Sequence, residues 1–186
     1  LQIDTSGNGT VLAETEQTHL RSIHFDKKHG LFVGGGEKGI LFHAPLKDLK
    51  SLRALYDSGQ DEITGITVLG DYAYIAGVSG ADALVSEQGN MSNTGQKRKS
   101  VNVQSQVAQV SIDGTAQVLA GSNDEVIFGM VIDSAGNALV STGATGRDDP
   151  RGRIYSIDPK RRLISLVYQS PSRRITHLLN LPRGAI

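Results

Sequence analysis

Internal repetition is the feature that most constrains how this chain can fold. Apolar segments of one pattern recur along the sequence, beginning at Leu20, Ile63, Ile127 and Ile175. A second series of apolar segments recurs with the same intervals, beginning at Leu12, Leu55, Leu119 and Val167. Two independent series with identical spacing indicate tandem structural units.

Each unit is built from short strands. The apolar runs are rich in Ile, Val, Leu, Tyr and Phe, mostly alternate with polar residues, and are separated by many of the 22 glycines. A third series begins at Ile40, Val107 and Arg153, so each unit holds four strands, here called A to D in chain order. Four strands in about 40–50 residues are typical of one blade of a β-propeller.

The repeat predicts where the strands lie. We expect A strands at residues 22–26, 65–69, 129–133 and 177–181, and B strands at residues 30–33, 72–76, 137–141 and 185–186. The C strands follow the third series, and the D strands follow the second, beginning near residue 11. The A–B turns such as Asp26–Gly30 and Asp133–Asn137 pair a capping Asp with a Gly suited to positive φ.

One β-propeller segment is therefore expected over residues 1–186, with repeats near 12–54, 55–118, 119–166 and a partial one at 167–186. The long second repeat indicates a polar loop insertion at about residues 81–105, which is an ordinary loop or else a lid or docking arm. The chain then holds about three full blades with a half-blade at each end. It is either a fragment of a larger propeller, which we favour, or a four-bladed ring closed by its two half-blades.

Composition argues against several functions. Lys and Arg (19) balance Asp and Glu (19), so nucleic acid is not an expected partner. The absence of cysteine removes disulfides, thiolate metal sites and Cys nucleophiles. No apolar run approaches the ~18 residues that span a membrane.

The run Gly34-Gly35-Gly36-Glu37-Lys38-Gly39 matches a dinucleotide fingerprint, but a strand follows it instead of a helix. No cofactor is therefore expected, and the glycines are interpreted as a B–C hairpin.

The segments HLRSIHFDKKHGLFVGGGEKGILF and VIFGMVIDSAGNALVSTGATGRDDPRGRIYSID resemble the tandem repeats of uncharacterised bacterial WD40-like β-propeller proteins. The resemblance extends over essentially the whole chain, although Gly-His and Trp-Asp dipeptides are absent. The resemblance implies an extracytoplasmic (periplasmic or secreted) propeller with a binding function whose ligand it does not specify. It supplies no catalytic residues.

The candidate site lies where the D–A loops and the first residues of the A strands surround the mouth of the central channel. Equivalent positions in successive repeats give the candidate ligand-binding residues His19, Arg21, Glu62, Thr64, Glu125, Phe128, Arg174 and His177. These side chains are polar for the most part and carry both signs of charge.

Three functions are compatible with such a mouth. The first is a non-enzymatic scaffold that binds a protein or small-molecule ligand. The second is a hydrolase or lyase of the lactonase kind that uses His19 and Glu62, directly or with a metal. The third is the sensor domain of a signalling protein. No catalytic or metal-ligating residue is assigned, and exposed D–A loops are polar in any propeller.

Overall fold

A computed structural model describes residues 1–80, 103–144, 151–172 and 174–180. Strands are the only regular elements in these ranges: β1 (Gln2–Ile3), β2 (Gly9–Thr10), β3 (Leu20–Asp26), β4 (Gly30–Gly35), β5 (Ile40–Ala44), β6 (Arg53–Asp57), β7 (Glu62–Leu69), β8 (Tyr72–Ser79), β9 (Gln104–Ser111), β10 (Ala116–Ser122), β11 (Glu125–Ile132), β12 (Ala138–Ala144), β13 (Arg153–Asp158) and β14 (Leu163–Gln169). The described part of the chain contains no helix long and apolar enough to cross a membrane.

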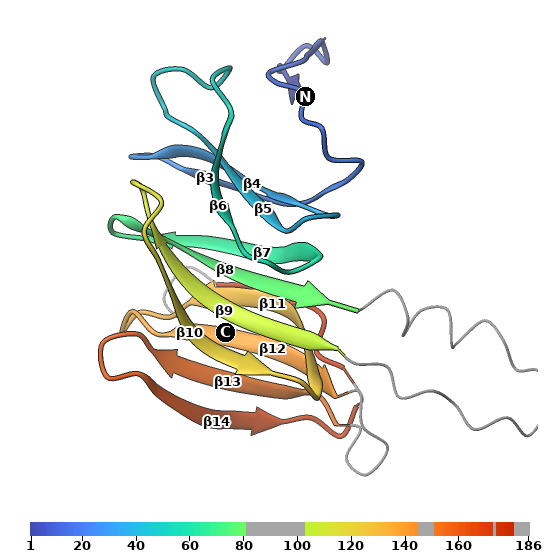
Figure 1. Cartoon of the computed structure of the whole chain (residues 1–186), viewed down its shortest axis with the longest axis vertical. Helices are drawn as coiled ribbons and strands as arrows, with labels where there is room; N and C mark the ends of the chain where they lie inside the picture. The colour runs from blue at the N-terminus through green and yellow to red at the C-terminus, as the bar shows by residue number, and fades with distance from the viewer. Residues whose placement is uncertain (81–102, 145–150, 173, 181–186) are drawn as a thin grey trace, which may run out of the picture.

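The strands form three four-stranded antiparallel sheets and one two-stranded hairpin. Each large sheet follows chain order, β3 to β6, β7 to β10 and β11 to β14, and the hairpin pairs β1 with β2. Figure 1 shows the three large sheets stacked on one another. The expected all-β fold of four-stranded blades is confirmed. The predicted repeats begin one strand earlier than the sheets. The D strand that opens a repeat is the last strand of the preceding sheet.

The first strands of the three sheets lie side by side, which makes them the inner strands of the blades. The Ser22 hydroxyl in β3 donates to the Ile63 carbonyl in β7 (2.8 Å), and the Thr64 hydroxyl in β7 donates to the Ile127 carbonyl in β11 (3.1 Å). At Gly34 in β4, an added Cβ would lie 2.8 Å from the Ile63 Cβ. The glycine run is thus a hairpin that permits close packing between blades, as predicted.

Burial of apolar side chains holds neighbouring sheets together. One core between the first and second sheets includes Phe32, Leu41, Ile63 and Ile75. A second core between the second and third sheets includes Val107, Met130, Val140 and Ile157. Transfer of this apolar surface out of water is the main force that stacks the blades.

Aspartate-capped turns close the hairpins. Asp26 Oδ1 accepts the backbone N–H groups of Lys28 and His29, and Asp133 Oδ1 accepts those of Ala135 and Asn137. The turn at Asp4 repeats the Asp133 pattern, with Asp4 Oδ1 accepting the N–H groups of Ser6 and Asn8.

Two expected strands at the chain ends are not formed. Residues 11–14 lie in a loop, because the Asp4 turn closes the first hairpin early and places β2 at Gly9–Thr10. Residues 177–180 are not a strand either, and their expected partner at 185–186 lies outside the described residues. The segment nevertheless lies beside β11, since the Asn180 side chain donates to the Ile132 carbonyl (2.7 Å).

The predicted insertion also extends too far. Its last residues, Gln104 and Ser105, belong to β9, and Ser105 is buried, while residues 81–102 lie outside the described part of the chain.

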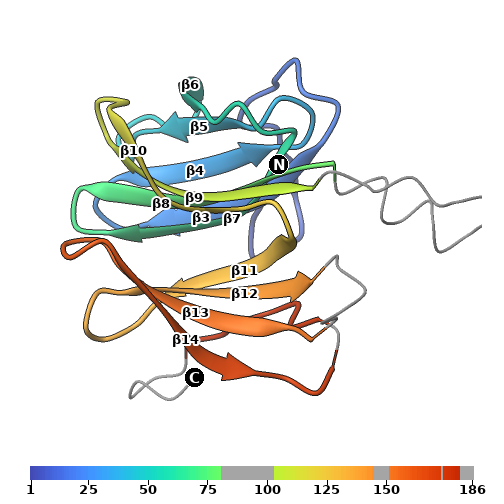
Figure 2. The same cartoon turned by 60° about the horizontal axis from the view of Figure 1, so that its bottom comes forward.

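The sheets form an open arc in the described residues. Figure 2 shows the β11–β14 sheet at the opposite end of the stack from the β3–β6 sheet. The two-stranded hairpin β1–β2 is a sheet of its own, and the described C-terminal residues do not pair with it. A closed four-bladed ring is therefore not seen in the described residues, and their open arrangement is consistent with a fragment of a propeller.

Candidate functional site

A β-bulge recurs at the same position of all three inner strands. The register shifts between Leu20 and Ser22 in β3, between Ile63 and Gly65 in β7, and between Ile127 and Gly129 in β11. The extra residues are therefore Arg21, Thr64 and Phe128, three of the candidate site residues. A bulge turns its extra side chain away from the regular alternation and is common beside binding sites.

Side-chain contacts connect the starts of neighbouring inner strands. Arg21 Nε lies 3.1 Å from Glu62 Oε2, which joins β3 to β7. The Arg174 guanidinium carbon lies 5.9 Å from the centre of the Phe128 ring, within cation–π range. We call the residues Arg21, Glu62, Thr64, Phe128 and Arg174 the mouth surface.

The two candidate histidines lie at the ends of this surface. His19 is exposed just before β3, and its carbonyl accepts the N–H of Gly36 (2.9 Å). His177 is exposed beyond β14, with Nδ1 3.0 Å from the Thr176 hydroxyl. Both side chains are thus accessible to a ligand.

Glu125 occupies a different environment from the other candidates. It is 93% buried, since only 7% of its surface is exposed. Arg153 donates to Glu125 Oε1 from Nη1, and the Tyr155 hydroxyl donates to the same oxygen (3.0 Å). Burial raises the pKa of Tyr155, and the bond to Glu125 raises it further, so the phenol keeps its proton. Glu125 therefore belongs to the interior between the second and third sheets.

A cavity of 230 Å³ lies beside Glu125. Its walls come from β9, β10, β12 and β13 as well as β11, and include Val107, Ala120, Val140 and Ile157. The sequence repeat could not reveal this cavity, because its residues occupy unrelated positions of two repeats. The alternation of Arg153 and Tyr155 on a predicted C strand is the only sequence signal, and it is weak.

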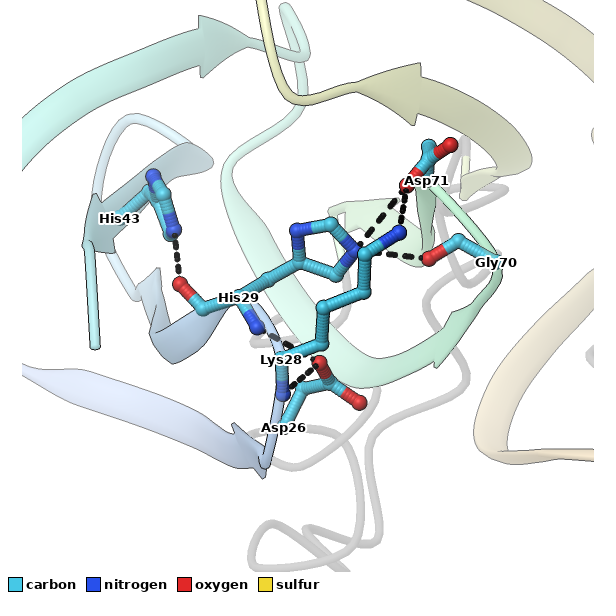
Figure 3. Close-up of polar contacts among 6 residues, drawn as sticks. All are labelled: Asp26, Lys28, His29, His43, Gly70 and Asp71. Carbon is cyan, nitrogen blue, oxygen red and sulfur yellow. Dashed lines mark hydrogen bonds and ion pairs between the residues drawn. The ribbon is translucent and has the colours of Figure 1, made fainter.

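A second polar cluster lies at the other end of the inner strands (Figure 3). His29 Nε2 lies 2.8 Å from the Gly70 carbonyl oxygen and 3.3 Å from Asp71 Oδ1, and Lys28 Nζ lies 2.6 Å from the same Asp71 oxygen. The hydrogen bond from Lys28, with its charge, lowers the pKa of Asp71. His43 is buried, stacks on Phe32 and bonds through Nε2 to the His29 carbonyl (2.8 Å). These contacts join the A–B turns of two blades, so the cluster has a structural role.

The possible metal ligands of the described residues are dispersed. Nowhere in residues 1–80, 103–144, 151–172 and 174–180 do three His, Asp or Glu side chains gather closely enough to hold an ion.

The comparisons with known proteins bear on the fold. No protein-family model matches the chain, and no curated protein matches it. A chain of the crystal structure of a nidogen/laminin complex superposes with a TM-score of 0.52 and 10% identity, covering 93% of this chain and 72% of that one. The S511A mutant of puromycin hydrolase, complexed with PGG, superposes with a TM-score of 0.49 and 15% identity over 79% of this chain and 22% of that one. The nidogen/laminin match supports the propeller fold and nothing beyond it.

Proposed function

We propose that this chain is a non-enzymatic binding scaffold that recognises a protein or another ligand through the mouth surface. The observation that carries the proposal is the repeated bulge. Each of the three sheets places its extra residue near the start of its inner strand, and these residues supply a cation, a hydroxyl and an aromatic ring. Arginine and aromatic side chains contribute strongly to protein–protein affinity.

The repeat pattern supports two further proposals. The chain belongs among the bacterial WD40-like propellers, and it works outside the cytoplasm. Neither rests on a sequence match to a known family, because none was found.

The alternative is a hydrolase or lyase at the same mouth. It is favoured by the packing of His19 and Arg21, which both approach Gly36, and by the pairing of Arg21 with Glu62. His19 and Glu62 thus both neighbour Arg21, and a histidine and a carboxylate are side chains that general acid–base chemistry uses.

A charge-matched pair of variants tests the scaffold. Arg21→Glu reverses a charge at the start of β3 and sets a second carboxylate beside Glu62, whereas Lys27→Glu makes the same change just past the other end of that strand. Immobilised chains are exposed to an extract of the source organism, and retained proteins are quantified by mass spectrometry. We expect at least one partner to bind Arg21→Glu about tenfold less and Lys27→Glu unchanged.

The outcome separates the alternatives. If every retained protein persists on Arg21→Glu, the mouth surface is not the binding face. If His19→Ala and Glu62→Ala abolish turnover of a lactone or ester panel while binding is unaffected, the enzyme alternative holds instead.

A further inference from the structure

The first sheet, β3 to β6, lies at one end of the stack, so the face that it turns away from the second sheet is not covered by another large sheet (Figure 1). We call this the outer face of the first sheet. Ile23 on this face is 72% exposed, and Phe25 is 53% exposed, although the hairpin β1–β2 lies on the same side of the stack. A group of large exposed apolar side chains is typical of an interaction surface.

The repeat shows that this face has the pattern of a junction between sheets. Ile23 lies two residues beyond the bulge of β3, and Ile66 and Met130 occupy the same position in β7 and β11. Both counterparts are only 8% exposed, because each packs in the core against the preceding sheet. One pattern thus gives a buried contact in the second and third sheets and an exposed face in the first.

Uncharged side chains make up the middle of the outer face. Cross-strand partners share a face of a sheet. Two rows of partners cross this one, with Ile23, Val33, Phe42 and Ala54 in the first row and Phe25, Leu31 and Ala44 in the second. Because none of these side chains carries a charge, two copies of the face can meet without repulsion between like charges.

We propose that the outer face of the first sheet binds the same face of a second copy of this chain, so that two chains form a dimer with two-fold symmetry. Two twisted sheets with apolar faces pack face to face as a sandwich. A two-fold dimer requires a patch that is complementary to itself, and an uncharged apolar sheet face meets that requirement. The proposal is independent of the mouth surface and of its proposed function.

The third sheet argues against a head-to-tail arrangement of the two copies. Such a contact would place β3 of one copy beside β11 of the other, as β7 lies beside β3 within the arc. Residues 174–180 already lie there, because an added Cβ at Gly129 would be 3.5 Å from the His177 Cα and Asn180 donates to the Ile132 carbonyl. The exposed Ile23 shows that β3 is not covered in this way.

The size of the face sets the strength of the dimer. Its four strands hold five to seven residues each, and with strands about 4.8 Å apart that rise about 3.4 Å per residue, the face measures roughly 400 Å² in projection. A standard stable interface buries about 800 Å² on each partner. We therefore expect a dimer that dissociates in the micromolar range.

Sedimentation velocity of the purified chain, from about 1 to 200 μM, measures this association. We expect the mass to rise with concentration from the 19.8 kDa of one chain toward twice that value. Ile23→Glu should weaken the association at least about 100-fold, because a two-fold interface receives each new carboxylate twice and buries it without a partner.

Two control variants locate the interface. Val118→Glu places the same charge at a 53% exposed residue of β10, and Tyr168→Glu places it at a 50% exposed residue of β14. Both should associate like the parent chain. Far-ultraviolet circular dichroism checks the fold of each variant, and Phe25→Glu tests the same face if Ile23→Glu does not fold.

Three results would overturn the proposal. A mass that stays at 19.8 kDa up to the highest concentration leaves the face to a different partner. Undiminished association of folded Ile23→Glu or Phe25→Glu places the contact elsewhere on the chain. Loss of association in Tyr168→Glu or Val118→Glu brings another sheet into the contact and contradicts a two-fold dimer formed through the first sheet.

Discussion

Individual glycines set how closely the blades approach. Gly34 faces the neighbouring inner strand, and its missing side chain admits Ile63. The sequence supported a structural interpretation of this glycine run, because a strand follows it where a nucleotide site needs a helix. The partner of Gly34 could not be predicted, since it lies on a different blade.

Substitution of Gly34 tests this packing. In Gly34→Ala the new methyl group would lie 2.8 Å from the Ile63 Cβ, too close for real carbon atoms, so the sheets must separate. We expect the free energy of unfolding to fall by about 1–3 kcal/mol in urea denaturation.

Gly121→Ala is the matched control, because its added Cβ meets only the Ser105 carbonyl oxygen at 3.5 Å, an ordinary contact. Its stability should stay within about 0.5 kcal/mol of the parent chain. Equal stability of the two variants would contradict close blade packing at Gly34.

At the scale of the element, hairpin turns are held by ionised aspartates. The hydroxyl of Ser111 and the backbone N–H of Thr115 lower the pKa of Asp113 below its ordinary value of 3.8. Partial burial raises the pKa of Asp133, but the hydrogen bonds from the backbone and side chain of Asn137 outweigh it and lower the pKa overall. These carboxylates therefore bind protons less readily in the folded chain than in the unfolded one.

Acid should weaken the fold through these turns. Because the folded pKa lies below the unfolded one, the stabilisation is complete above about pH 5 and is lost as the pH falls through the folded pKa. In Asp133→Asn the unfolding free energy should be lower at pH 7 and should decline less steeply between pH 5 and pH 2. Urea denaturation at several pH values measures the slope, and Glu14→Gln, an exposed carboxylate outside such turns, should keep the slope of the parent chain. If the slope were unchanged in Asp133→Asn, the Asp133 turn would not contribute to the loss of stability in acid.

Most elements could be predicted from the sequence, because alternating apolar residues and Asp–Gly turns are local signals. The strand predicted at residues 11–14 was wrong, since the turn at Asp4 already closes the hairpin. The strand predicted near His177 was wrong for residues 177–180, because an apolar pattern alone does not establish the pairing that a strand needs.

At the scale of the whole molecule, the inner strands bring the residues of the mouth surface together. The described sheets do not close into a ring. Ile23 is 72% exposed on β3, and Val167 is 59% exposed on β14, so both end sheets carry apolar surface in contact with solvent. Arg21, Thr64 and Phe128 lie at the bulges near the starts of the inner strands, whereas Glu125 is buried. Its burial depends on the packing of two sheets, which no local pattern encodes.

The central claim is that the first strands of successive sheets lie side by side as inner strands of blades. An engineered disulfide tests it, because the chain has no cysteine of its own. An added Cβ at Gly65 in β7 would lie 3.6 Å from the Met130 Cβ in β11, within the separation that disulfides require. The control pair joins Gly65 to Tyr168 on the outermost strand of the third sheet.

Mass spectrometry of the non-reduced double variants after mild oxidation is the most direct measurement. We predict an intramolecular disulfide in Gly65→Cys/Met130→Cys and free thiols in Gly65→Cys/Tyr168→Cys. Free thiols in the first variant, or equal cross-linking in both, would contradict the propeller arrangement of the blades.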